Sequence, residues 1–168
     1  MKIRLKKLAE GAALTCARAD GSVVTQRTGH GGFFALHDLM HLAVESALGY
    51  GQAFWGLVAD GWAFETFGDR TDPRYQSMPA QALWAENLVA ILQRRAGEAD
   101  CDDEALMGIL TEEVNAEWMA TLRGCDSLPP ALTSAHVASI LCLYFALAAQ
   151  WMELPVNSTM ELQFPATS

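Results

Sequence analysis

The sequence predicts an α+β protein. We expect a small N-terminal antiparallel sheet, completed by a C-terminal strand, packed beside a bundle of about four or five helices. Three observations lead to this prediction. Apolar and polar residues alternate in the first 28 residues, around an Asp-Gly pair. Most of the remaining chain repeats its apolar residues at helical spacing. Alternation then returns near the C-terminus, over residues 159–164.

The N-terminal region, residues 1–28, predicts strands joined by a hairpin. Residues 2–8 alternate basic with apolar side chains, as a half-exposed strand does. Segments 12–19 and 22–27 flank the Asp-Gly pair at 20–21, which favours a two-residue β-turn. Residues 159–164 place Met160, Leu162 and Phe164 on one face, so this segment is expected to join the same sheet.

Residues 36–152 predict the helical body. A first helix over 36–48 is closed by Gly49, because glycine adopts the left-handed conformation that ends many helices. A short helix and turn follow within 54–62. The next helix is expected to begin at Ser77 and to reach about Ala96, and a further one to begin at Asp102 or Asp103 and end near Gly124.

The last predicted helix begins at Thr133 or Ser134 and ends before Pro155. It contains the uncharged stretch 137–149, which is too short to span a bilayer alone, since a span takes about 20 residues. We therefore expect this helix, with Cys142 as a reduced and buried thiol, at the centre of the bundle.

Composition narrows the class of protein. The chain has 168 residues, 51% of them hydrophobic, which is enough for a core and indicates a single domain over 1–168. The formal net charge of -9 argues against binding nucleic acid through bulk electrostatics. The four cysteines show no C-x-x-C spacing, and no signal peptide or membrane span is recognised, so we expect a cytoplasmic protein.

One motif carries chemistry: His37-Asp38-Leu39-Met40-His41, inside the first predicted helix. Positions i and i+4 share a helix face, so the two imidazoles can chelate one metal ion, as they do in H-E-x-x-H zinc helices. Asp38 stands where the glutamate of that motif stands and is a candidate base or a partner of the ligands. Glu45, at i+8, is expected to partner His41 rather than to bind the ion.

A closed site needs a third ligand from elsewhere in the chain. The candidates are Glu65, Glu86, His136 and His30. Glu86 is the first choice, because it lies in the middle of a predicted helix, where a carboxylate is costly to bury unless it is paired.

The stretch 37–45, with Gly49 and residues 54–61, resembles a group of uncharacterised bacterial proteins, a likeness that covers roughly residues 20–65 and implies no activity. His37-Asp38-x-x-His41 also resembles the zinc motif of a helical ubiquinone-biosynthesis family. That family has a glutamate twelve positions after the second histidine, where this chain has Ala53. The adjacent His37-Asp38 is similar to HD-type phosphohydrolases, which are all-helical.

Three hypotheses remain open at this point. The leading one is a metal-binding protein, with zinc or another divalent transition metal on His37 and His41, which would act as a metal-dependent hydrolase on an unidentified small molecule. The second is a metal-free interaction or scaffold protein, a homodimer or larger homo-oligomer, in which the histidines are structural. The third is metal-free acid/base catalysis by a histidine–carboxylate pair. None of them predicts a nucleic-acid or membrane partner.

Overall fold

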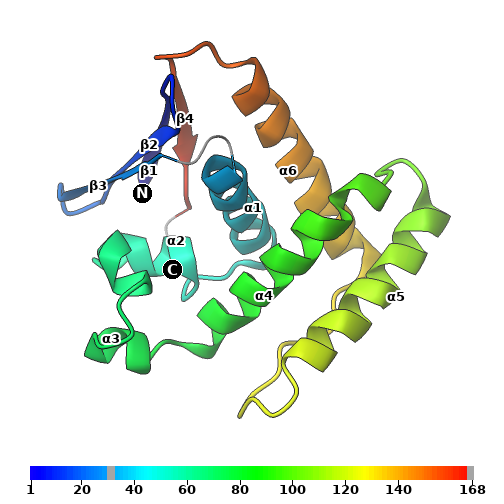
Figure 1. Ribbon diagram of the computed structural model, residues 1–168. Coiled ribbons are helices and arrows are strands. Elements are labelled where there is room, and N and C mark those ends of the chain that lie inside the picture. The colour runs from blue at the N-terminus through cyan, green and yellow to red at the C-terminus, as the bar shows by residue number, and fades with distance from the viewer. Residues whose placement is uncertain (30–32, 166–168) are drawn as a thin grey trace.

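The computed structural model describes residues 1–29 and 33–165 (Figure 1). The strands are β1 (Lys2–Lys7), β2 (Ala12–Ala17), β3 (Val23–Thr28) and β4 (Thr159–Gln163). The α-helices are α1 (Phe33–Leu48), α2 (Phe54–Ala59), α3 (Pro73–Gln76), α4 (Ala80–Arg95), α5 (Glu104–Thr121) and α6 (Ser134–Glu153). Two short 3-10 helices are η1 (Phe64–Phe67) and η2 (Ala96–Glu98). The predicted α+β class is confirmed.

The four strands form one antiparallel sheet in the order β3-β2-β1-β4, so the C-terminal strand completes the N-terminal sheet as predicted. The pairing of β1 with β4 brings Met1 next to Phe164, and the ammonium group of Met1 donates to the carbonyl of Phe164 at 2.9 Å. One face of the sheet is buried, and the other is charged. The buried face carries the side chains of Ile3, Leu5, Leu14, Cys16 and Met160. On the outer face, Lys2 and Arg4 form ion pairs with Glu161.

Helix α1 lies in the middle of the molecule, between the sheet, α6 and α4 (Figure 1). Its residues contribute to two apolar clusters. Leu39 and Leu42 pack with the sheet, whereas Met40 and Val44 pack with α4, α5 and α6. A helix that is apolar on most of its circumference must be buried on most sides, which explains its central place.

The helix ends mostly follow the predicted caps. Gly49 has φ 67° after α1, the side chain of Asp103 accepts from the backbone N–H of Leu106, and that of Thr133 accepts from His136. The predicted start of α4 at Ser77 is wrong, because that helix begins at Ala80 and Ser77 instead closes α3. A residue before proline is biased towards extended backbone, so Met78-Pro79 interrupts helix between the two.

The prediction that α6 occupies the centre of the bundle is also wrong. One face of α6 is buried, through Val137, Ile140, Leu141, Leu147 and Trp151. The opposite face is open: Met152 is 66% exposed, and Cys142 is exposed rather than buried. By length and composition α6 could also cross a membrane, with 28% of its apolar window buried here. Apolar composition predicted the helix, but it did not separate a central helix from one at the edge.

Candidate metal centre

A polar stripe runs along α1 between its two apolar faces. His37, His41 and Glu45 follow each other at four-residue intervals and therefore lie on one side of the helix. His41 and Glu45 are 3% and 1% exposed, which is unusual for such groups unless they are paired. The stripe faces α4 on one side and the start of α2 on the other, and both supply partners.

His41 is bonded at both ring nitrogens. Its Nδ1 lies 3.2 Å from Oε1 of Glu45, and its Nε2 lies 3.1 Å from Oε2 of Glu86. When both carboxylates are ionised they only accept hydrogen bonds, so both ring nitrogens then carry hydrogen and the ring is an imidazolium. Burial alone would lower the pKa of His41, but the hydrogen bonds to the two carboxylates outweigh it and raise the pKa to about 9.

Glu45 is held by the N-terminal end of α2. Its Oε2 accepts the backbone N–H groups of Trp55 at 2.9 Å and of Gly56 at 3.3 Å. Burial raises the pKa of Glu45, and its bonds to His41 and to these N–H groups act in the opposite direction. At Gly56 a Cβ would lie 2.0 Å from the carbonyl oxygen of Gly51, so only glycine allows α2 to sit this close.

His37 has a corresponding outer partner on α4. Its Nδ1 lies 2.9 Å from Oε1 of Gln93, and because an amide oxygen accepts, Nδ1 is the donor. Its Nε2 then faces Oε1 of Glu86, at 3.8 Å. Burial lowers the pKa of His37, and the nearby charge of His41 lowers it further. The neutral ring expected from this shift presents its Nε2 lone pair to Glu86.

His37, His41 and Glu86 thus form a group that could hold a metal ion. Ligand atoms from the three residues all lie within 4.8 Å of one another. Two ligand atoms of a tetrahedral zinc ion are about 3.4 Å apart, and the Nε2-to-carboxylate separations of 3.1 and 3.8 Å fall on either side of that value. An ion here would take the place of the proton on Nε2 of His41.

Glu86 was expected because a buried carboxylate in a helix needs a partner, but its side chain is 60% exposed. The residue therefore lies at the edge of the group rather than in the core. Its hydrogen bond from His41 lowers the pKa of Glu86, which keeps the carboxylate ionised.

The group opens onto a cavity of about 800 Å³, which is within the usual size range of small-molecule sites. His37, His41 and Glu86 all line it. The rest of the lining is largely aromatic and comes from α1, α2, η1 and α3. Its aromatic members are Phe34, Phe54, Phe64, Phe67 and Tyr75. A bound ion would be reachable from this cavity.

Asp38 also lines the cavity but is not a member of the three-residue group. Burial is the main cause that raises the pKa of Asp38 to about 7. The charge of His41 lowers this pKa, and the charge of Glu86 raises it. The backbone carbonyl of Asp38 accepts the indole N–H of Trp55 at 3.1 Å, a second link between α1 and α2.

The other candidate ligands lie outside the group. Glu65 lines the same cavity from η1. His136 sits at the start of α6, where its Nδ1 accepts the backbone N–H of Thr133, so its ring completes a capping box. His30 lies outside the described residues.

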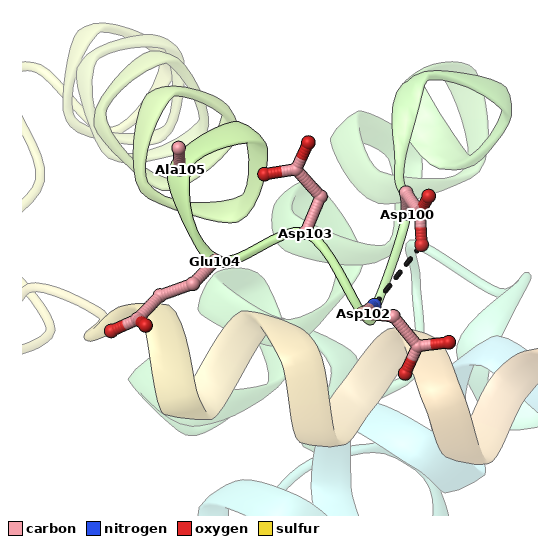
Figure 2. A pocket seen from close by; sticks show the side chains of 5 residues that line it. All are labelled: Asp100, Asp102, Asp103, Glu104 and Ala105. Carbon is pink, nitrogen blue, oxygen red and sulfur yellow. Dashed lines mark hydrogen bonds between the residues drawn. The ribbon is translucent and has the colours of Figure 1, made fainter.

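A second cluster of acidic residues precedes and begins α5 (Figure 2). Asp100 accepts the backbone N–H of Asp102, and Asp103 caps α5. Figure 2 shows the carboxylates of Asp102, Asp103 and Glu104 pointing in different directions. Within residues 1–29 and 33–165, the group of His37, His41 and Glu86 is the one whose geometry suits a metal ion.

Two parts of the site were not expected from the sequence: Gln93, and the N–H groups of Trp55 and Gly56. Gln93 lies seven residues after Glu86, two turns along the same face of α4. That heptad spacing of two polar residues is the signal that could have identified it. The N–H groups of α2 carry no sequence signal.

Comparison of the chain with family models, curated proteins and solved structures finds no match. The fold and the site together define an α+β domain in which two histidines and one glutamate could hold a metal ion.

Proposed function

We propose that this protein binds a divalent transition metal, zinc being the best fit, through His37, His41 and Glu86. The ligands would be Nε2 of each histidine and the carboxylate of Glu86. One observation carries the proposal: the three side chains converge, and separate outer groups hold Nδ1 of each histidine. Such outer hydrogen bonds orient most metal-ligating histidines.

The ligand set favours zinc. Two imidazoles and one carboxylate are the donors found in many catalytic zinc sites, which leave a fourth position open. The cavity lies on the side where that open position is expected, because all three ligands line it. A structural zinc site would instead be closed by a fourth protein ligand.

We further propose that the centre belongs to a metal-dependent hydrolase. A zinc ion with an open position supplies Lewis-acid chemistry. Glu45 and Gln93 would hold the two imidazoles in place, and Asp38, on the cavity wall beside His37, is placed to hold or pass a proton. We expect such a protein to be soluble and cytoplasmic.

Zinc binding is tested on protein purified without a histidine tag. Calorimetry measures the affinity during a zinc titration, and elemental analysis measures the number of ions bound per chain. We expect about one ion per chain, lost in His41→Ala and weakened about tenfold or more in Glu86→Gln. His136→Ala is the matched control and should bind zinc like the parent protein. Absence of binding in the parent protein, or unchanged binding in His41→Ala, would contradict the proposal.

The alternative is a metal-free homodimer with structural histidines, and the open face of α6 favours it. This face is centred near Cys142, with Leu143 and Met152 at its two margins, and the helix carries no charged residue from Ser134 to Met152. Since the chain has a net charge of -9, an uncharged face is where two copies would meet with least repulsion. Sedimentation of the parent protein and of Leu143→Glu decides this: a dimer dissociated by the substitution supports it, and a monomeric parent excludes it.

A further inference from the structure

We infer that the cavity beside the candidate metal centre binds a compact organic amine, a positively charged group on an aromatic or bulky apolar body, and discriminates against acids and phosphates. The inference deepens the proposed function, on which it rests for the reaction of the bound molecule. The ligand would bind in the cavity that His37, His41 and Glu86 line.

The walls of the cavity supply the apolar contacts. Phe54 and Phe67 lie with ring centroids 4.9 Å apart, and the ring of Phe54 is 5.3 Å from that of His41. The aromatic wall therefore continues to the candidate ligands. On the side of α4, Ala82 and Leu83 line the same space. A ligand with an apolar body of about one or two rings would bury it against these side chains.

The charges that line the cavity are acidic. They come from Glu65 and Glu86, with a partial charge from Asp38, whose pKa burial raises to about 7, and no lysine or arginine of the described residues lines it. The positive charge of His41 is already shared between Glu45 and Glu86. An anionic ligand would meet carboxylates, whereas an ammonium group would gain both from them and from the aromatic faces.

Two arginines that contact segments beside the cavity, Arg18 and Arg74, already have partners in the fold. Arg18 donates to the carbonyl oxygens of Val58, at 2.5 Å, and of Trp62, at 2.6 Å, which ties β2 to the end of α2. Arg74 is paired with Asp72 and lies over the ring of Trp62. A bound divalent ion would take the place of the His41 proton and balance Glu45 and Glu86, and it would still leave Glu65, which is exposed at the cavity.

A matched series of naphthalene probes tests the inference: 1-naphthylmethylamine, 1-naphthalenemethanol and 1-naphthaleneacetate, which share one ring system and differ in charge. Their dissociation constants are measured by equilibrium dialysis, with metal-free protein and again after addition of zinc. We expect the amine to bind about tenfold more tightly than the acetate in metal-free protein, with the alcohol between them. Chemical-shift changes at the lining residues locate the bound amine.

Two variants separate site binding from attraction to an acidic protein. Glu65→Gln alters an exposed side chain, so it should fold normally and reduce the preference for the amine about threefold or more. Glu104→Gln removes the same charge from the distant start of α5 and should leave the preference unchanged. Acetate binding as tightly as the amine, no probe binding at millimolar concentration, or equal effects of the two variants would overturn the inference.

The two proposals fail separately. Amine binding without zinc binding would refute the metal centre and leave the ligand class standing. Zinc binding without a preference for the amine would refute the ligand class and leave the metal centre standing.

Discussion

Nδ1 of His41 lies 3.2 Å from Oε1 of Glu45, one turn along the same helix, and both side chains are almost fully buried. The pair links three elements, because Glu45 also binds the backbone of α2 and His41 reaches Glu86 on α4. A buried ionic contact of this kind is costly to disrupt on one side only, since the remaining charge loses its partner.

Glu45→Gln should therefore weaken both the fold and metal binding. The amide is neutral and has one acceptor oxygen where the carboxylate has two, so the imidazolium and the N–H groups of Trp55 and Gly56 compete for it. We expect the free energy of unfolding to fall by about 1–3 kcal/mol and zinc affinity to fall by about 10–100-fold. Urea unfolding and zinc titration measure these effects.

The control for that variant is Glu112→Gln, on the exposed surface of α5. It should change the free energy of unfolding by less than about 0.5 kcal/mol. If the two substitutions have equal effects, the contact between Glu45 and His41 does not have the importance assigned to it.

Gly56→Ala should destabilise the protein, because α2 lies close to Gly51 in the loop that joins α1 to α2. The added Cβ would lie 2.0 Å from the carbonyl oxygen of Gly51, so α2 must move away and weaken the contact of Gly56 with Glu45. We expect a loss of about 2 kcal/mol or more in the free energy of unfolding.

Gly108→Ala, inside α5, is the matched comparison. Nothing lies within 4 Å of its added Cβ, and alanine favours helix over glycine, so this substitution should stabilise the protein by up to about 1 kcal/mol. Thermal unfolding of both variants checks that Gly56→Ala lowers the stability of the protein and that Gly108→Ala raises it. A neutral Gly56→Ala would mean that α2 is not closely packed here.

Gln93→Ala should reduce zinc affinity while leaving the fold largely intact. Gln93 is half-buried and holds Nδ1 of His37, so its loss frees the imidazole to rotate. We expect an affinity about tenfold lower and a small change in the free energy of unfolding. Gln150→Ala, on the open face of α6, should leave zinc affinity unchanged, and an equal loss in both variants would exclude an orienting role for Gln93.

Acid should weaken the contact between α4 and α5. Glu117 accepts from Nε of Arg95 at 3.1 Å and also pairs with Arg94, and chiefly the bond from Arg95 lowers the pKa of Glu117 below its usual 4.5. A carboxyl group with a lowered pKa contributes stability that is fully present above its unfolded-state pKa and is lost as pH falls through the folded-state value.

Urea unfolding at about pH 7, about pH 5 and about pH 3 tests this. We expect Glu117→Gln to cost most stability at the highest of these pH values and progressively less as the pH falls below 4.5, because the ion pairs of Glu117 in the parent protein are lost as its carboxylate is protonated. A cost that does not depend on pH would contradict the assignment.

The fold could be predicted largely because local signals agreed with the tertiary arrangement. Alternation predicted the hairpin, and Gly49 and Thr133 mark helix ends. The predicted two-residue turn is wrong, because the last strand pair joins Ala17 to Val23 and the connection between them is longer, with Gly21 at φ 85°. The place of α6 could not be predicted in the same way. Its apolar residues encircle the helix, and only the packing of α1 and α5 determines which of them are covered.

The candidate site could be predicted in part. His37 and His41 followed from spacing within one helix, and Glu86 was chosen for a burial that the structure does not show. Gln93 and the N–H groups of α2 depend on how α4 and α2 pack against α1, which no local pattern encodes. Sequence therefore located the residues of the stripe on α1, and tertiary packing supplied most of their partners.

The central claim is that His37, His41 and Glu86 bind one metal ion together. Anomalous diffraction at the zinc edge, from crystals of protein loaded with one equivalent of zinc, tests it most directly. We expect one main peak, about 2.0–2.2 Å from Nε2 of both histidines and from a carboxylate oxygen of Glu86. A main peak elsewhere, such as at the acidic segment before α5, or no ordered zinc between these three side chains, would contradict it.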